Sequence, residues 1–247
     1  MSRAQVGTAA ALIIGNELLS GKVRDENLDS LARTLRALGI RLCRAVFLED
    51  DLASIAREID TLSHSYDVVF TSGGVGPTHD DVTIDAVALA FGTSVVHDPE
   101  FSKLIQGAYG ERCTEAHLRM ARIPQGAELV TSHEISWPTV LMRNVWVMPG
   151  VPEIFRMKLS LVRERLQGPV RFHSRVVYTQ LEESDLKPLL DLVVQNHPQV
   201  QVGSYPKWFD SSYKTKVTLD ATDPEVTTRA FDELLSLLPP GEPQRTE

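Results

Sequence analysis

Apolar runs of strand length alternate with helical patterns along the first two thirds of the chain. Residues 6–14 (VGTAAALII) form a continuous apolar run, as expected of a strand that is buried on both faces. Leucines at helical spacing follow within residues 28–38, and the succession repeats through a strand pattern at 40–48 and a helical pattern at 52–62. This alternation predicts a mainly parallel sheet with helices on both faces.

The third strand pattern leads into the most informative stretch, residues 67–92 (DVVFTSGGVGPTHDDVTIDAVALAFG). Its apolar run ends in three glycines and a proline within five residues, and two adjacent aspartates precede an apolar helical pattern. Glycines let backbone N–H groups approach an anion, and the start of a helix adds a partial positive charge. The stretch therefore predicts a phosphate-binding loop. A purely structural turn, in which Asp80 or Asp81 caps the helix, is the alternative.

The pattern changes near Gly168-Pro169, which we interpret as a linker. Beyond it, strand and helix patterns follow in the order β-α-β-β-α, which is typical of a small α+β unit with antiparallel strands. The predicted fold is a three-layer α/β/α sandwich with a mainly parallel sheet at residues 1–168 and a small α+β domain at 169–240. Residues 241–247 are proline-rich and charged, and we expect them to form a frayed tail.

Composition argues against several classes of protein. The net charge of -8 and the pI near 5.4 are unlike those of proteins that bind nucleic acids or membrane surfaces through a basic face. Neither a membrane span nor the apolar core of a signal peptide is visible in the sequence. Cys43 and Cys113 form no disulfide framework and no metal-type cluster. We therefore expect a soluble, cytoplasmic protein.

Three further loops follow predicted strands. The first contains Gly15 and Glu17, the second contains Asp50, and the third contains Pro149 and Gly150. All should face one edge of the sheet, because the carboxyl ends of parallel strands lie together. Carboxylates beside an anion-binding loop suit a divalent cation or an activated water, although each loop taken alone also suits an ordinary helix start. Together the loops predict a ligand site at this edge.

The chain carries three motifs in a fixed order: IGNELLSG, GGVGPTHDDVT and VMPGVPE. In these motifs it resembles the molybdopterin-binding-like domain family, over roughly residues 6–165. That domain occurs in molybdenum-cofactor biosynthesis proteins, in the competence/damage-inducible protein A family and in the N-terminal half of eukaryotic-type FAD synthases. The stretch SWPTVLMRNVWVMPGVPE resembles the FAD synthases more than the competence proteins. The trailing unit with VQVGSYPKW resembles the small domain that follows in the competence and FAD-synthase groups.

The resemblance also implies roles for individual residues. Asp81 and Asp50 are the implied catalytic residues, and Glu17, Asp50 and Asp81 are the implied ligands of a divalent metal (Mg²⁺, Mn²⁺ or Co²⁺), with K⁺ as a further candidate ion. We interpret Asp80 as a helix cap or as a residue that supports the ligand-binding side chains without contacting the ligand itself. The predicted ligand- or phosphate-binding residues are Gly15, Ser72, Gly73, Gly74, Gly76, Pro77, Thr78, Pro149 and Gly150.

Members of the competence and FAD-synthase groups are associated with metal-dependent cleavage of nucleotide diphosphates. The resemblance therefore implies a nucleotide pyrophosphohydrolase that acts on a dinucleotide such as FAD or ADP-ribose. A non-catalytic molybdopterin- or nucleotide-binding protein is the alternative, and a dimeric partner of another enzyme is a third hypothesis. The chain contains neither an adenylyltransferase nor an amidohydrolase-type domain, so neither FAD synthesis nor nicotinamide-nucleotide deamidation is expected.

The expected partners follow from the same considerations. We expect a small nucleotide or pterin ligand, and no nucleic-acid or membrane partner. From the small second unit and the habit of the family, we also expect a homodimer or a higher homo-oligomer.

Overall fold

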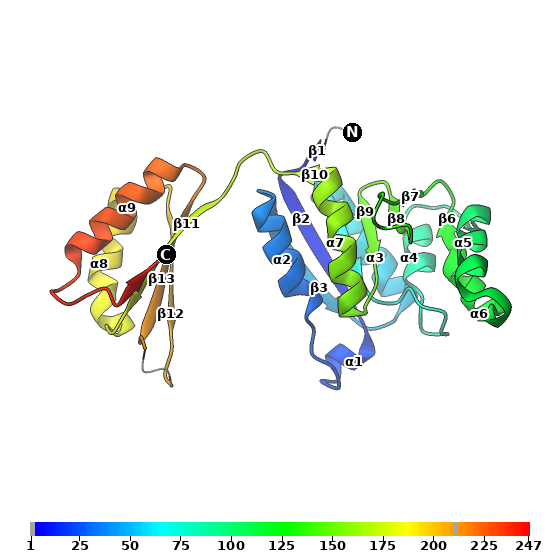
Figure 1. Ribbon diagram of the computed structural model, residues 1–247, viewed down its shortest axis with the longest axis horizontal. Coiled ribbons are helices and arrows are strands. Elements are labelled where there is room, and N and C mark those ends of the chain that lie inside the picture. Colours follow the sequence, from blue (N-terminus) through cyan, green and yellow to red (C-terminus); the bar gives the residue numbers. More distant parts are fainter. Residues whose placement is uncertain (1–2, 210–211) are drawn as a thin grey trace. The chain divides into compact units, whose positions relative to one another are not determined.

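The protein is described by a computed structural model that covers residues 3–209 and 212–247 (Figure 1). The chain divides into two compact units, Met1–Pro169 and Val170–Glu247. The strands of the first unit are β1 (Ala4–Gln5), β2 (Thr8–Ile14), β3 (Arg41–Leu48), β4 (Val68–Ser72), β5 (Val95–His97), β6 (Arg122–Pro124), β7 (Glu128–Val130), β8 (Thr139–Met142), β9 (Val145–Met148) and β10 (Leu166–Gln167). Its helices are α1 (Asn16–Leu19), α2 (Asn27–Ala37), α3 (Leu52–Ser65), α4 (Thr83–Ala90), α5 (Pro99–Tyr109), α6 (Glu115–Leu118) and α7 (Pro152–Arg165), with 3₁₀ turns η1 (Gly110–Arg112) and η2 (Arg119–Ala121).

The main sheet of the first unit has six strands in the order β3-β2-β4-β9-β8-β7. Strands β3, β2, β4 and β9 are parallel, whereas β8 and β7 join the edge as antiparallel strands. The expectation of an α/β fold with a mainly parallel sheet is confirmed. The four parallel strands all end at the same edge of the sheet, and this edge carries the glycine-rich and acidic loops.

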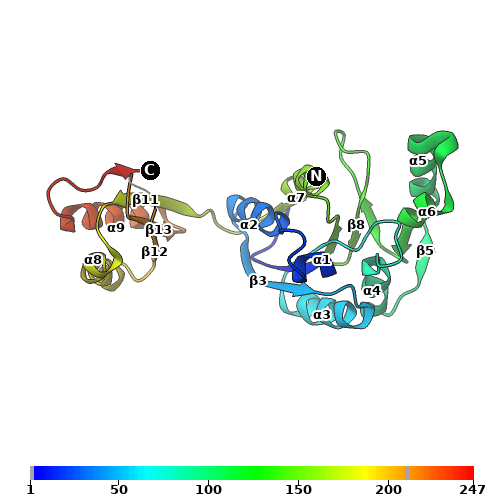
Figure 2. The ribbon, with the colours of Figure 1, turned by 90° about the horizontal axis from the view of Figure 1, so that it is seen from below.

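Helices cover both faces of this sheet, and strand β2 shows why. Its successive side chains point to opposite faces, so Ala9 and Ile13 pack into one core while Ala10 and Leu12 pack into the other. The first core is completed by α2 and α7 and the second by α3 and α4, as Figures 1 and 2 show. A strand without polar side chains is stable only between two such layers, which explains the three-layer arrangement.

A small lobe interrupts the sandwich between α4 and β7. It consists of α5, α6, the two 3₁₀ turns and the antiparallel pair β5–β6. Phe101, Ile105 and Ala121 form its own buried cluster, against which Trp137 packs from the main domain. An ion pair of 2.5 Å between Arg122 and Asp85 also ties β6 to α4. The lobe is therefore held beside the edge of the sheet that carries the loops.

The second unit is a small α+β domain, as the sequence predicts. Its elements are β11 (His173–Thr179), α8 (Glu183–Asn196), β12 (Gln201–Pro206), β13 (Thr215–Ala221), α9 (Pro224–Leu237) and β14 (Arg245–Thr246). The strands form an antiparallel sheet in the order β12-β13-β11-β14. Its core lies between this sheet and the helices α8 and α9.

The expectation of a frayed tail at residues 241–247 is wrong. Arg245 and Thr246 pair with β11 as an edge strand, and the guanidinium of Arg245 lies 4.0 Å from the centre of the Tyr178 ring. The backbone amide of Gln244 also donates to the carbonyl of Tyr178. The tail is polar, but an open strand edge with unsatisfied backbone groups gives such a segment a partner.

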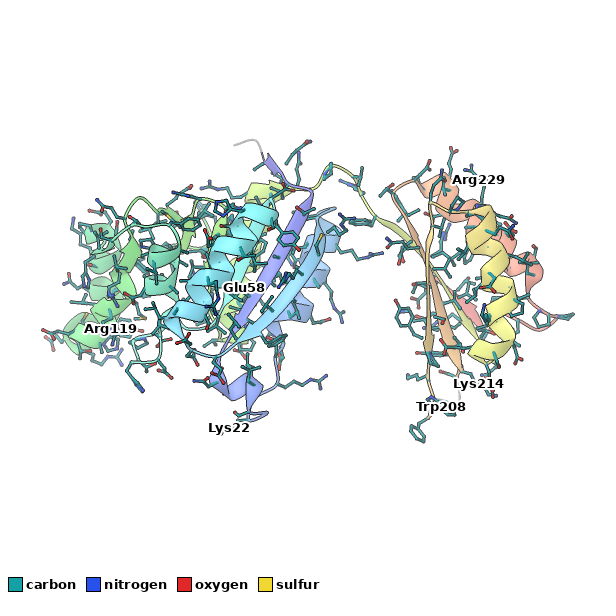
Figure 3. All side chains as sticks on the ribbon, turned by 180° about the vertical axis from the view of Figure 1, so that it is seen from behind. Lys22, Glu58, Arg119, Trp208, Lys214 and Arg229 are labelled. Carbon is teal, nitrogen blue, oxygen red and sulfur yellow. The ribbon has the colours of Figure 1, made fainter. Side chains whose placement is uncertain are left out.

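The connection between β12 and β13 presents two large aromatic side chains to solvent. Trp208 is 87% exposed and Phe209 is 104% exposed, and Trp208 projects from this end of the unit in Figure 3. Exposed aromatic pairs are typical of contact surfaces. We therefore expect light scattering to give at least twice the chain mass of 27.4 kDa, as for a homodimer. A monomer mass at micromolar concentration would contradict this prediction.

Among the described residues, no helix is long and apolar enough to cross a membrane.

Candidate functional site

The loops after β2 and β3 are joined by two hydrogen bonds that backbone amides donate. The amide of Gly15 donates to the carbonyl of Leu48 over 3.1 Å, and the amide of Asn16 donates to Oδ2 of Asp50 over 2.9 Å. The carboxylate of Glu17 folds back against Gly15, where a Cβ atom would collide with it. Glu17 and Asp50 are therefore brought to the same corner of the sheet edge.

The loops after β4 and β9 approach each other even more closely. The amide of Gly73 donates to the carbonyl of Met148 over 3.2 Å. A Cβ atom added at Gly150 would lie 3.3 Å from the Cα atom of Gly73, and one added at Gly73 would collide with the carbonyl oxygen of Ile14. Gly73 also has a φ of +102°, which L side chains rarely adopt. Glycine is required here for both reasons.

Asn27 at the start of α2 connects these two loops. Its side chain is only 4% exposed, and its Nδ2 donates to the Ser72 hydroxyl over 2.9 Å and to the Gly150 carbonyl over 2.7 Å. Its Oδ1 is buried and has no hydrogen-bond partner among the described residues. Ser72 in turn donates to the carbonyl of Pro149. This network fixes the end of β4 to the turn that opens α7.

Asp81 organises the glycine-rich loop rather than capping a helix. Its Oδ2 accepts from the backbone amide of Thr78 over 2.7 Å and also from the Thr78 hydroxyl. The N-cap of α4 is Val82, which makes no side-chain capping bond, so the alternative that Asp80 or Asp81 caps the helix is wrong. The amide of Thr83 donates instead to the carbonyl of Gly74, and the Thr83 hydroxyl donates to the carbonyl of Gly73.

The two aspartates after β3 have different tasks. Asp51 is the N-cap of α3 and accepts from the amide of Ser54 over 2.8 Å. Hydrogen bonding from the Ser54 side chain, and next from its backbone amide, lowers the pKa of Asp51. Asp50 faces the other way, toward the amide of Asn16. A run of acids ahead of a helix is thus divided between a cap and a residue at the sheet edge.

All four loops line one cavity of about 830 Å³. A volume of this size suits a small-molecule ligand or a dinucleotide. Most of the predicted site residues lie on its wall, namely Gly15, Glu17, Asp50, Gly73, Gly74, Gly76, Asp81, Pro149 and Gly150. Ser72, Pro77 and Thr78 do not line it. Ser72 lies beneath the wall in the Asn27 network, and Thr78 supports Asp81.

The other residues that line the cavity are largely apolar and aromatic. The small lobe supplies Phe101, Tyr109 and Met120, the segment before β8 supplies Trp137, β8 supplies Val140, and α7 supplies Ile154 and Met157. The rings of Phe101 and Trp137 meet edge to face with their centres 5.5 Å apart. Arg119, a labelled residue of the lobe in Figure 3, adds a cation to the wall. The cavity therefore offers glycine loops and carboxylates together with a ring-binding surface.

Acidic side chains predominate at the loop end of the cavity. Glu17, Asp50, Asp80 and Asp81 all line it. Hydrogen bonding to the Thr78 side chain lowers the pKa of Asp80, which keeps that carboxyl ionised. In residues 3–209 and 212–247, however, no group of three or more His, Cys, Asp or Glu side chains is placed to hold a metal ion. The predicted ligands Glu17, Asp50 and Asp81 share the cavity but do not form a preformed three-ligand cluster.

Sequence reasoning missed Lys158, Arg119 and Trp137 as cavity residues. Lys158 had a signal in the sequence, because it occupies an inward position of α7 together with Phe155 and Leu159. A lysine on the apolar face of a helix is unusual unless its charge has a task. Arg119 and Trp137 had no local signal, since only the packing of the lobe brings them to the sheet edge.

Comparisons with known proteins agree with this architecture. Residues 10–167 match the family model described as "Probable molybdopterin binding domain", and residues 171–247 match the model described as "FAD synthase, middle domain". The two matches correspond to the two compact units of the structure.

Several relatives are similar over most of the chain. A "Probable FAD synthase" of Caenorhabditis elegans is 31% identical over 94% of this chain and 50% of that protein, and a "CinA-like protein" of Thermotoga maritima is 30% identical over 79% and 50%. The chain thus spans about half the length of these curated relatives. Among solved structures, the protein CinA of Thermoplasma acidophilum, described as of unknown function, superposes with a TM-score of 0.59 at 26% identity, over 65% of this chain and 98% of that one.

Proposed function

Because this chain belongs to the molybdopterin-binding domain family and carries a FAD synthase middle domain behind it, we propose that it is a metal-dependent nucleotide pyrophosphohydrolase. Its substrate is a dinucleotide such as FAD or ADP-ribose. Relatives named as a FAD synthase and as a CinA-like protein support a nucleotide-processing role. The observation that carries the proposal is the meeting of two glycine turns, four carboxylates and several aromatic side chains in one cavity.

The cavity suits the parts of such a substrate. The backbone around Gly73 and Gly74 and the start of α7 after Gly150 provide a place for the two phosphates, since helix starts and glycine turns favour anions. Phe101, Trp137 and their neighbours provide a surface for one of the planar rings. A dinucleotide spans both features, whereas inorganic phosphate would use only one.

Carboxylates beside a diphosphate repel it unless a cation lies between them. Mg²⁺ commonly uses one or two carboxylates together with substrate phosphates, rather than a cage made by the protein alone. The donor set of Glu17, Asp50 and Asp81 fits a metal held in this shared way, although these residues form no cluster of their own. When bound, the metal supplies charge neutralisation on the phosphates.

The chemical step is hydrolysis of one phosphoanhydride bond. A water attacks one phosphorus, the P–O bond to the bridging oxygen breaks, and FAD plus water gives AMP plus FMN. Asp81 is the residue that we assign to orient this water and accept its proton, because the loop holds one of its oxygens while the residue faces the cavity. The amides of the glycine loop stabilise the developing charge.

A non-catalytic binding protein for molybdopterin or a nucleotide is the second candidate. The family description names a pterin ligand, and the absence of a preformed three-ligand cluster among the described residues favours binding without turnover. Tight calorimetric binding of a pterin or nucleotide with no change in ligand mass would support this function instead.

A screen of metals against nucleotides tests the proposal. The purified protein, stripped with a chelator, is supplied separately with Mg²⁺, Mn²⁺ and Co²⁺ and incubated with FAD or ADP-ribose. We expect mass spectrometry to show AMP together with FMN or ribose 5-phosphate. If no metal gives AMP above the chelated blank with either substrate, the proposal is wrong.

A further inference from the structure

Lys158 is a buried cation with no acidic partner in the part of the chain that the structure describes. The residue is 4% exposed, and its Nζ donates to the carbonyls of Trp137 and Pro138 and, over 3.0 Å, to the hydroxyl of Thr139. These three acceptors are neutral, and Lys158 forms no ion pair among the described residues. Burying a charge without a counter-charge is costly, so the position calls for an explanation beyond packing.

The charged groups nearest to Lys158 in the chain form ion pairs with other residues, and further charged groups line the same cavity. On its own helix, Arg156 pairs with Glu26 and lies 3.9 Å from Glu153. Near β7, Arg165 pairs with Glu128 over 3.0 Å. The charged residues that line the cavity with Lys158 are Glu17, Asp50, Asp80, Asp81, Arg119 and Arg122. None of these forms an ion pair with it in the described part of the chain, and burial alone accounts for its shifted pKa.

Lys158 also lies on the helix that opens at the second glycine turn. It is six residues beyond Pro152, which corresponds to about 9 Å along the axis. Side chains on a helix lean toward its N-terminus, so the ammonium group lies nearer to this start than its Cα atom does. Both Lys158 and Gly150 line the cavity. The buried positive charge therefore adds to the partial positive charge at the start of α7, and both favour an anion there.

We propose that Lys158 is the built-in counter-charge for the diphosphate of the ligand, and that the bound anion compensates a positive charge that no carboxylate of the described residues balances in the free protein. The inference rests on the proposed ligand class but not on turnover. Lys158 acts through its field and not by direct hydrogen bonding, since its three donors already hold residues 137–139. We therefore assign it as a positioning and charge-compensating residue.

This role has a consequence that a structural lysine would not have. Burial lowers the pKa of Lys158 to about 8, so close to half of the free protein is deprotonated there at pH 8. An anion beside the ammonium group raises the pKa. A rise of about one unit would make binding take up about 0.4 proton at pH 8. At pH 6.5 the lysine is already charged, and this uptake disappears.

Calorimetry with ADP-ribose tests the inference. Each phosphorus of this probe carries one ester and one anhydride bond, so neither phosphate titrates near pH 8. Ca²⁺ replaces Mg²⁺, Mn²⁺ and Co²⁺, so that a cation lies between the phosphates and the carboxylates without the metals of the activity screen. Titrations in buffers of different ionisation enthalpy give the number of protons taken up. We expect about 0.4 proton at pH 8 and none at pH 6.5 for the natural protein. The absence of AMP after each titration is checked by mass.

Three variants separate charge from packing. Lys158→Met removes the charge and keeps most of the stem, and we expect about tenfold weaker binding and no proton uptake. Lys158→Arg keeps a charge that does not titrate, and we expect binding within about threefold of the natural protein with no uptake. Lys103→Met replaces an exposed lysine of α5 that pairs with Glu100. It controls for the loss of a lysine and should change neither quantity. Thermal midpoints of all variants establish that each is folded.

The possible outcomes are distinct. If the natural protein binds ADP-ribose without proton uptake, or does not bind it, the inference is wrong, even if the enzyme hydrolyses FAD with metal present. If Lys158→Met takes up as many protons as the natural protein, another group titrates and the inference is again wrong. Lysine-dependent uptake without any hydrolysis in the metal screen would support the inference and contradict only the proposed turnover.

Discussion

Asp81→Asn should reduce the rate of AMP release from FAD or ADP-ribose by on the order of 100-fold or more, while leaving the protein folded. The amide retains an oxygen that can accept from the Thr78 backbone amide, a bond of 2.7 Å, so the loop keeps its support. It loses the negative charge that would accept a proton and neutralise a metal. Initial rates with the preferred metal, together with the thermal midpoint, measure the two effects separately.

Asp80→Asn is the matched control for this prediction. Asp80 is adjacent, lines the same cavity and carries the same charge, but it is exposed and lies 3.9 Å from His79. We expect it to retain at least about a third of the activity. Thr78→Val removes one hydrogen-bond donor to Asp81 and should give an intermediate loss. If Asp80→Asn and Asp81→Asn lose equal activity, the rate depends on the total negative charge in the cavity and not on one catalytic carboxylate.

Gly73→Ala should lower the free energy of unfolding by about 2–4 kcal/mol and abolish ligand binding. A methyl group at this position collides with the carbonyl oxygen of Ile14, which belongs to strand β2 and cannot move without disturbing the sheet. Its φ of +102° adds strain for any L side chain. Urea unfolding measures the stability, and calorimetry with ADP-ribose measures the binding.

Gly92→Ala isolates the backbone contribution. Gly92 follows α4 with a φ of +62°, and a Cβ atom there would meet nothing within 4 Å. We expect the substitution to lower the free energy of unfolding by about 1 kcal/mol and to leave ligand binding intact. A Gly73→Ala protein as stable as Gly92→Ala would show that the loop can move away from β2, and the close approach of the two loops would then not be required.

Several features followed from the sequence because their causes are local. Continuous apolar runs predicted buried strands, and Ala9 to Ile14 alternate between two cores as such a strand must. The glycines of the loop predicted a close approach of the backbone without Cβ atoms, and a Cβ atom at Gly73 would collide with the carbonyl oxygen of Ile14. The topological rule for parallel strands was enough to place the loops of Glu17, Asp50 and Asp81 on one cavity.

Hydrogen bonding decided what the local patterns could not. Adjacent acids look equivalent in sequence, yet Asp51 caps α3 while Asp50 bonds to the loop after β2. Asp81 holds Thr78, and α4 begins without a side-chain cap. Each carboxylate accepts from a backbone amide that the fold places beside it, and the position of that amide depends on the neighbouring loops. The polar tail forms an edge strand for the same reason, because β11 presents an open edge.

The sequence by itself determined the layers, the sheet edge that carries the glycine and acidic loops, and the family to which the chain belongs, because periodicity and turn chemistry are read residue by residue. Only the tertiary structure decided how the site is completed. Arg119 and Trp137 reach the cavity through packing of the small lobe. Lys158 donates to residues 137–139, and to no carboxylate among the described residues, because of how α7 meets that segment. Such placements depend on contacts between segments far apart in the chain, and no local pattern records them.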